Sequence, residues 1–593
     1  MRSMILFSAI ACLATLPGPG MAQGDACVAL TPDTTGVVGN DGITNPLLLN
    51  TLVAGVDEAL VFPDSKSIVD MPLTAPPSEV YAAYAELGLP DPLTDIEAFQ
   101  TNATINETLQ EFVATWLTEP GTDLANVTGL VGPNPPEWFE TIEDPNLKRW
   151  ADSLYEAWNL LTRQVAPNVS MDTQLYTMLP VPNPFVVPGA RFREVYYWDS
   201  FFVIQGLLAS NLTTLAENIL DNFAYLVQTY GHIPNGIRTY YINRSQPPLF
   251  SEMVRIVYEA SGDESVLERA LPALLAEHAY WTSAPKQVEV LSPDGSTTYN
   301  LSRYHADWDT PRPESFREDQ ETARKAGFDP AAPTAATRQL YRDLASGAES
   351  GWDYSTRWLA ENSTDLSTIR TTRVLPADLN AFLYQMERNI ATFADTLGCA
   401  DVADRFDAAA EARREALDAL SWDPAAGQWY DLIIDAEDGD GLAGPVSVAP
   451  NAVVFPSNWF PLYAGVAEAG SVQAAAAVAA FNASGLLMEG GVPASLVESG
   501  QQWDYPNVWP PIQGLLVQGF RNAGGAEAEA LAQTIAETYV NQALRTWEET
   551  GANFEKFNST LVGRPGGGGE YAVVTGFGWT NGVALHLIQQ YDL

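Results

Sequence analysis

The stretch ADVADRFDAAAEARREALDAL (400–420) shows most clearly the pattern from which the fold can be predicted. Its apolar residues recur at i, i+3, i+4 and i+7 with charged residues on the other side, which predicts an amphipathic helix with one buried face. A short turn, LGCAD (397–401), precedes it, and an earlier helical segment begins near PADLNAFL (376–383). Two such helices form a hairpin that cannot bury both faces alone, so repeated hairpins stack or close.

The same hairpin recurs along the chain from about residue 146 to the C-terminus. One helix of each pair begins at a loop marked by tryptophan or proline, near 198–202, 246–253, 376–383, 457–465, 508–515 and 578–585. The partner helices lie near 147–164, 213–229, 264–282, 400–418, 470–482 and 525–547. Six hairpins predict an all-α fold, an (α/α)6 barrel or toroid. An open helical solenoid is the alternative, and closure is favoured because it gathers the aromatic and acidic loops at one end.

The region before the hairpins divides into two parts. Arg2, an apolar run over 4–16 and small residues up to Ala22 are typical of a secretory signal peptide, so residues 1–22 are predicted to be a cleaved leader. Residues 23–145 are rich in Pro, Thr and Asp with short helical pieces. We expect them to form an N-terminal extension packed on a barrel of residues 146–593.

The chain is strongly acidic, with 74 Asp and Glu against 30 Lys and Arg and a formal charge of −44. Such a surface repels phosphate backbones and anionic lipid head groups, so nucleic-acid and membrane partners are not expected. A neutral ligand such as a sugar is compatible with it. The leader predicts a secreted protein. Ten N-x-S/T sequons favour a glycosylated extracellular protein, whereas a Thr-rich periplasmic protein with unmodified sequons is the other interpretation.

Cysteine and histidine are scarce. Beyond the predicted leader only Cys27 and Cys399 remain, and they are able to pair in an oxidising compartment, but two cysteines so far apart define no framework. None of the four histidines is spaced as a metal ligand, so no metal site is predicted.

Three loops place a carboxylate directly after a tryptophan: Trp198-Asp199, Trp352-Asp353 and Trp503-Asp504. An indole beside a carboxyl excludes water and raises its pKa, which keeps a general acid protonated near neutral pH. Tryptophan faces also offer stacking surfaces for sugar rings. Each pair alone is more simply interpreted as a helix cap beside a core aromatic residue, and their recurrence is what favours chemistry.

Arginines and glycines accompany these pairs. Guanidinium groups are able to hold sugar hydroxyls or, alternatively, to pair with carboxylates of neighbouring helices. The arginines in question are Arg191, Arg193, Arg244, Arg312 and Arg317. The run GRPGGGGEY (563–571) lacks the Lys-Ser/Thr of a phosphate-binding loop. Its four consecutive glycines indicate a lid or a backbone passing close to a ligand, with a flexible surface connection as the alternative.

In their order along the chain, these segments resemble the trehalase family of glycoside hydrolases. The segments are PGARFREVYYWDSFF (188–202), GHIPNG (231–236), NRSQPP (243–248), PRPES (311–315), ESGWDYSTRW (349–358), QQWDYPNVWPP (501–511), GGGGEY (566–571) and GFGWTNG (576–582). The resemblance, which runs from about residue 145 to the C-terminus, implies an (α/α)6 catalytic domain and no metal or organic cofactor. It implies hydrolysis of α,α-trehalose to two glucose molecules with inversion, and we expect a monomer.

The resemblance also implies roles for individual residues. Asp353 would be the general acid that protonates the glycosidic oxygen, and Glu555 in NFEKF the general base that deprotonates the attacking water. In an inverting enzyme the two carboxyls lie roughly 6.5–9.5 Å apart. The residues implied to hold glucose are Arg191, Trp198, Asp199, Asn235, Arg244, Ser245, Gln246, Arg312, Glu314 and Gly351, with Glu570 on the lid.

Two segments depart from the family pattern. Ala190 replaces the second of two glycines in the first signature, and Val508 and Pro510 stand in the second signature, which usually ends Gly-Trp-Ala-Pro. Valine rarely adopts a positive φ and proline lacks a backbone donor, so these substitutions would shift affinity or specificity if the loop shapes the pocket. The alternative functions are an inverting glucosidase or phosphorylase acting on another glucoside, and a trehalose-binding pseudoenzyme.

Overall fold

The computed structural model describes residues 26–30, 51–435, 444–571 and 573–593. The predicted leader and its cleavage point lie outside these residues. Each of the twelve helix positions predicted from the sequence holds a helix. Six of these helices begin at the loops marked by tryptophan or proline and are here called the inner helices. They are α8 (Tyr197–Ala209), α10 (Phe250–Ser261), α14 (Ala377–Thr396), α16 (Phe460–Tyr463), α18 (Pro510–Ala523) and α20 (Gly578–Tyr591). Their partners, the outer helices, are α6 (Pro145–Leu161), α9 (Thr213–Tyr230), α11 (Ser265–Trp281), α15 (Ala400–Ala416), α17 (Val472–Ala483) and α19 (Ala526–Thr550).

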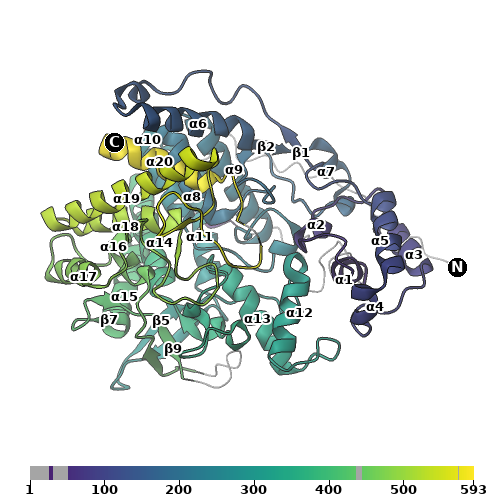
Figure 1. The fold of residues 1–593 in the computed structure, drawn as a ribbon. Helices are drawn as coiled ribbons and strands as arrows, with labels where there is room; N and C mark the ends of the chain where they lie inside the picture. The colour runs from purple at the N-terminus through teal and green to yellow at the C-terminus, as the bar shows by residue number, and fades with distance from the viewer. Residues whose placement is uncertain (1–25, 31–50, 436–443, 572) are drawn as a thin grey trace.

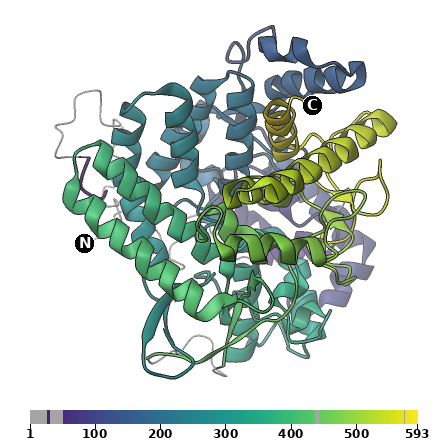
Figure 2. The same cartoon turned by 90° about the vertical axis from the view of Figure 1, so that its left-hand side faces the viewer.

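The inner helices form a closed ring. Each contacts the next in chain order, and the last, α20, returns to pack against the first, α8. Outer helices cover the ring from outside, as the antiparallel pair α14 and α15 illustrates, running side by side in green in Figure 2. The predicted (α/α)6 barrel is therefore confirmed, and the open solenoid is excluded because its first and last helices would not meet.

The inner and outer helices differ in how many of their side chains are buried, because their surroundings differ. In α8 nearly every side chain is buried, because the helix is covered both by its ring neighbours and by the outer layer. In α15 exposed charged residues alternate with a buried stripe, as expected of a helix with one solvent face. The closure point depends on glycine: a Cβ at Gly206 of α8 would lie 2.4 Å from the Cα of Gly582 in α20.

Smaller elements precede the hairpins or are inserted between them. The remaining helices of the barrel region are α7 (Pro167–Met171), α12 (Phe316–Lys325) and α13 (Ala335–Glu349). The strands are β1 (Leu124–Asn126), β2 (Thr162–Val165), β3 (Phe185–Val186), β4 (Gln287–Leu291), β5 (Thr298–Ser302), β6 (Val374–Leu375), β7 (Trp422–Asp423), β8 (Gln428–Trp429), β9 (Leu432–Ile434), β10 (Val448–Pro450), β11 (Asn507–Val508) and β12 (Phe557–Asn558). They pair antiparallel in sheets of two or three strands, and in the β11–β12 pair strand β12 begins two residues after Glu555.

The N-terminal extension is built from short helices gathered on one side of the barrel (Figure 1). They are α1 (Thr51–Glu58), α2 (Lys66–Val69), α3 (Pro77–Glu86), α4 (Ile96–Thr101) and α5 (Ala103–Trp116). Their apolar side chains form a separate hydrophobic cluster, to which the barrel contributes Tyr196, Tyr240 and Tyr241. Strand β1 then pairs with β2, which ties the end of the extension to the first hairpin.

A cluster of buried charges lies between the extension and the barrel. Arg238 contacts Asp123 at 2.6 Å, Glu194 at 3.0 Å and Asp70 at 3.5 Å, and Lys66 contacts Glu194 at 2.7 Å. All five side chains are almost fully excluded from solvent. We call these five residues the charged seam.

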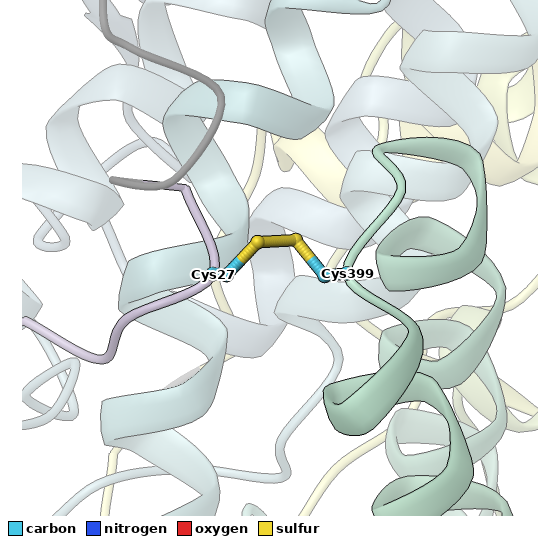
Figure 3. The surroundings of a disulfide bond; sticks show 2 residues. All are labelled: Cys27 and Cys399. Atoms are coloured by element: carbon cyan, nitrogen blue, oxygen red, sulfur yellow. A yellow bond between two sulfur atoms is a disulfide. The ribbon is translucent and has the colours of Figure 1, made fainter.

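A disulfide joins Cys27 to Cys399, with the two Cα atoms 5.7 Å apart. Figure 3 shows the bond between the N-terminal segment and the turn that links α14 to α15. The structure thus settles the pairing that the sequence left open. In the described part of the chain, no helix has the length and apolar character needed to cross a bilayer.

Candidate active site

A cavity of about 700 Å³ opens among the loops that precede the inner helices. Trp198 and Asp199 come from the start of α8, Arg244 and Gln246 from the segment before α10, and Trp509 from the residue before α18. The aromatic and acidic loops therefore meet around one cavity, as the closed barrel predicts.

All but one of the candidate site residues line this cavity. Those that do are Arg191, Trp198, Asp199, Asn235, Arg244, Gln246, Arg312, Glu314, Gly351, Asp353, Glu555 and Glu570. Ser245 is the exception: its backbone N–H donates to Glu349 and its hydroxyl to the carbonyl of Ile233, so it holds the loop from behind.

Asp353 lies on the loop that follows α13, where it is half-buried and lines the cavity. Burial raises the pKa of its carboxyl to about 6, and the positive charges of Arg312, Arg244 and Lys556 limit that rise. A carboxyl of this kind is still partly protonated near neutral pH, which suits a proton donor.

The loop of Asp353 is shaped by its neighbours. Gly351 adopts φ +74°, and a Cβ there would lie 2.9 Å from the indole of Trp198. Behind the loop, the buried Glu349 carboxylate accepts hydrogen bonds from Lys286 at 2.7 Å and from the backbone of His305 at 2.8 Å. Through Ser245 and Glu349 the loop of Asp353 is therefore fixed to the loop of Arg244.

Glu555 lies near the C-terminal end of the chain, two residues before β12. Its Oε1 accepts a hydrogen bond from the Tyr571 hydroxyl at 2.7 Å, and its carbonyl accepts one from the Trp579 indole at 3.0 Å. Oε2 is buried and accepts no hydrogen bond from the residues that the structure describes. Burial raises the pKa of Glu555, while Lys556 and the Tyr571 hydroxyl act in the opposite direction.

The aspartates of the three Trp-Asp pairs lie in different environments. Their indoles meet: Trp503 stacks on Trp352 with ring centroids 5.2 Å apart and lies 5.8 Å from Trp198. Asp199 faces the cavity, and burial together with the charge of Glu555 raises its pKa well above the usual range.

Asp504, by contrast, lies outside the cavity. It accepts hydrogen bonds from Ser355, Thr356 and Ser499, and so ties the segment after Asp353 to the loop of Trp503. Two of the three pairs thus supply carboxyls to the site, and the third acts as a structural cap.

Each cavity arginine is also engaged by a carboxylate. Arg191 contacts Asp64 at 2.9 Å, Arg312 contacts Asp319 at 2.6 Å and Glu570 at 3.1 Å, and Arg244 pairs with Glu314. The two interpretations of the arginine loops, sugar binding and carboxylate pairing, are therefore compatible, because the same guanidinium groups line the cavity and hold carboxylates. Glu570 in particular connects the glycine-rich segment to Arg312.

Several cavity residues escaped the sequence analysis. Asp64, Ser65 and Lys66 of the extension line the cavity, although the extension was expected only to pack on the barrel. Tyr571, which lines the cavity next to Glu570, was also missed. Lys556 was missed as well, although it does not itself line the cavity. The sequence offered one indication that Lys556 belongs to the site, because it is one of only five lysines in the chain and adjoins Glu555.

The two departures from the family pattern are accommodated by the backbone. Ala190 adopts φ +51°, the left-handed conformation that glycine prefers. Val508 lies in β11 opposite Phe557, and Pro510 is the first residue of α18, where a missing N–H costs nothing. Neither Val508 nor Pro510 lines the cavity, and Trp509 between them does.

Carboxyls that line a tryptophan-rich cavity among the loops of a closed helical barrel fit a glycoside hydrolase. The chain belongs to the trehalase family, whose sequence model matches residues 60–592. The match reaches well into the extension, whereas the resemblance seen in the sequence motifs was expected to begin only at about residue 145.

Relatives and solved structures agree with this assignment. A probable trehalase of Oryza sativa subsp. japonica is 38% identical over 94% of this chain and 98% of its own length. The trehalase of Homo sapiens is 35% identical over 91% and 88%, and a periplasmic trehalase of Xanthomonas campestris pv. campestris is 42% identical over 77% and 76%. The neutral trehalase Nth1 of Saccharomyces cerevisiae, 21% identical, shares the fold with a TM-score of 0.60 over 76% of this chain and 94% of its own.

Proposed function

We propose that this protein hydrolyses α,α-trehalose to two glucose molecules with inversion at the anomeric carbon that is attacked. The observation that carries the proposal is the presence of the half-buried Asp353 and the buried Glu555, from different parts of the chain, in the same cavity. Membership of the trehalase family and the names of its relatives supply the substrate.

Asp353 acts as the general acid. Its proton passes to the glycosidic oxygen as the bond to the anomeric carbon breaks, so that the leaving glucose departs as a neutral alcohol. The pKa of about 6 makes this proton available at mildly acidic pH. The rate should therefore fall as pH rises through about 6, where the acid becomes ionised.

Glu555 acts as the general base on the opposite side of the sugar ring. It removes a proton from a water molecule whose oxygen attacks the anomeric carbon, and one water is consumed for each bond broken. Tyr571 fixes Oε1 by a hydrogen bond, which leaves Oε2 to accept the proton of the water.

The remaining cavity residues bind and orient the two sugar rings. The indole of Trp198 and the ring of Tyr571 offer apolar faces, and Gln246 and the arginines offer donors for hydroxyl groups. The Asn235 amide nitrogen already donates to the carbonyls of Ser245 and Ala348, so Asn235 offers its Oδ1 as an acceptor. Because the arginines already contact Asp64, Glu314 and Glu570, each donor fork is oriented before substrate binds.

We further propose that the protein is exported with residues 1–22 as its leader and acts as a monomer in the periplasm or outside the cell. The Cys27–Cys399 disulfide supports an oxidising compartment, and the periplasmic trehalase of Xanthomonas campestris supports the first location. Residues 23–145 would serve as the extension and 146–593 as the catalytic domain.

Proton NMR of the purified protein with trehalose tests the mechanism. Equal early amounts of α- and β-glucose, before mutarotation mixes them, are expected from inversion. Early α-glucose alone would indicate retention. Release of glucose 1-phosphate only in the presence of phosphate would favour a phosphorylase, and binding without turnover a pseudoenzyme.

Substitution of the two carboxyls tests their roles. Asp353→Asn and Glu555→Gln keep the shape of each side chain and remove the proton-transfer group, so we expect kcat to fall by roughly 10²–10⁴-fold in each. Full activity in either variant would remove that residue from the proposal. An unchanged circular dichroism spectrum in both variants shows that the loss comes from chemistry and not from unfolding.

A further inference from the structure

Between the two carboxyl-bearing segments lies a pair of buried polar side chains that the proposed mechanism leaves unused. Gln502 and Lys556 are 1% and 0% exposed. The Lys556 ammonium donates a hydrogen bond to Gln502 Oε1 at 2.8 Å. The Gln502 amide in turn donates from Nε2 to the backbone carbonyl of Asp353. One lysine and one glutamine thus connect the residue after the base to the residue that is the acid.

The pair also reaches the glycine-rich segment. The Lys556 ammonium donates to the carbonyl of Gly568 at 3.3 Å, and the carbonyl of Lys556 accepts a hydrogen bond from the N–H of Gly566 at 3.0 Å. A Cβ at Gly569 would lie 2.7 Å from Gln502 Oε1, so only glycine allows the segment to pass this close. The acid loop, the base segment and the glycine-rich segment therefore meet at these two side chains.

The ammonium group lies among aromatic faces rather than against a carboxylate. Its nitrogen is 4.9 Å from the ring centroid of Trp509 and 5.7 Å from that of Tyr571, distances at which a cation is attracted to the ring face. In the part of the chain that the structure describes, no carboxylate oxygen lies within 4.0 Å of it. Its charge is thus not neutralised by a direct ion pair and acts on its wider surroundings.

We propose that Gln502 and Lys556 are positioning residues for the reaction, which hold the acid loop, the base segment and the glycine-rich segment in one arrangement and keep a positive charge beside Glu555. This inference rests on the proposed roles of Asp353 and Glu555. Neither Gln502 nor Lys556 lines the cavity, so both act through other residues.

The charge of Lys556 has a definite electrostatic consequence. The groups that act on Glu555 are Lys556, Tyr571, Asp353 and Arg191, and Glu555 in turn acts on Asp199. Among those that lower the pKa of Glu555, Lys556 has the largest effect, and it also lowers the pKa of Asp353. Removing the ammonium group should therefore raise both pKa values and move the whole pH–rate profile to higher pH.

The test measures kcat and KM for trehalose across pH in the full-length protein and three variants. In Lys556→Met we expect both limbs of the profile to move up by about one pH unit, with kcat falling on the order of 100-fold and KM changing by less than about threefold. Lys556→Arg keeps the charge and should hold both limbs within about 0.3 pH units of the original. Lys325→Met, which removes an exposed lysine of α12, is the matched control and should leave the profile unchanged.

A second variant separates position from charge. Gln502→Leu removes both hydrogen bonds but no charge, so kcat should fall by about tenfold while the acidic limb stays in place. This variant also provides the test if Lys556→Met does not fold. Unmoved limbs in Lys556→Met, or full kcat in Gln502→Leu, would overturn the inference.

The outcomes for the proposed function are distinct. If the original protein does not hydrolyse trehalose, or Glu555→Gln retains full activity, then the proposed function fails. If both behave as proposed and only the Lys556 and Gln502 variants act like the control, then the function stands and this inference alone fails.

Discussion

The barrel and the N-terminal extension are held together by different forces. The barrel is a continuous apolar core in which tryptophans and aliphatic side chains from all twelve paired helices contact one another. The extension has its own smaller apolar cluster, and its contacts with the barrel include three tyrosines, the charged seam and further ion pairs such as Arg324–Glu58. Apolar burial tolerates many residue choices, whereas buried charges are stable only when each finds its partner. The extension should therefore be the more easily uncoupled of the two regions.

This difference bears on function, because the extension contributes to the cavity. Asp64 contacts Arg191, and Lys66 belongs to the charged seam while lining the cavity. Uncoupling the extension would thus damage the site without opening the barrel.

The largest effect should come from the centre of the charged seam. Arg238→Met leaves Asp70 and Glu194 with Lys66 as their one remaining cation in the seam and leaves Asp123 with none, so we expect the free energy of unfolding to fall by about 3–5 kcal/mol. Denaturant unfolding followed by hydrogen exchange should show residues 51–117 losing protection before α8.

Arg388→Met is the control for loss of an arginine, since Arg388 forms an exposed pair with Asp407, and about 1 kcal/mol or less is expected. Equal effects of the two substitutions would contradict the special role of the seam.

The two apolar cores can be compared by matched cavities. Leu109 in the extension and Leu226 in the barrel are both 0% exposed, and truncation to alanine should cost about 2–5 kcal/mol in either. We expect Leu109→Ala to weaken protection in residues 51–117 alone and Leu226→Ala to weaken it across the barrel. Global loss of protection in both variants would show that the regions unfold as one cooperative unit.

The disulfide is expected to have the next effect. It attaches the start of the extension to the barrel, while α6 follows its end, so the extension is fixed at both ends. Cys399→Ser should reduce the free energy of unfolding by about 2–4 kcal/mol under oxidising conditions. The original protein in reducing buffer is the control and should match the variant; a variant as stable as the oxidised protein would show that the extension holds without this bond.

The smallest effect should be on substrate binding. Asp64→Asn removes the carboxylate that orients Arg191, an ion pair worth about 1 kcal/mol, so KM should rise by about three- to tenfold with kcat within about twofold. Steady-state kinetics measures this directly, with the exposed Glu97→Gln of α4 as the control. An unchanged KM would show that the extension borders the cavity without serving it.

The barrel could be predicted from the sequence because its signals are local. Apolar spacing as in 400–420 marks a helix wherever it occurs, and each of the twelve predicted positions holds one. The ordered motifs identified thirteen candidate site residues, and the structure gathers all of them except Ser245 around one cavity.

Other features of the site could not be predicted from the sequence motifs. The Trp503-Asp504 pair looks the same in sequence as the pairs at 198–199 and 352–353, yet Asp504 is satisfied by hydroxyl groups of a neighbouring loop and does not face the cavity. A motif states which residues are adjacent in the chain and not which groups surround them.

The sequence by itself determined the helical repeat, the acidic surface and the set of residues from which a site can be made, because periodicity, net charge and motif order are properties of neighbours along the chain. Only the tertiary structure decided that Cys27 meets Cys399, that Asp64 of the extension meets Arg191, and that Gln502 links Asp353 to Lys556. Those contacts join segments tens to hundreds of residues apart, and they form only once the closed ring has fixed which loops face one another.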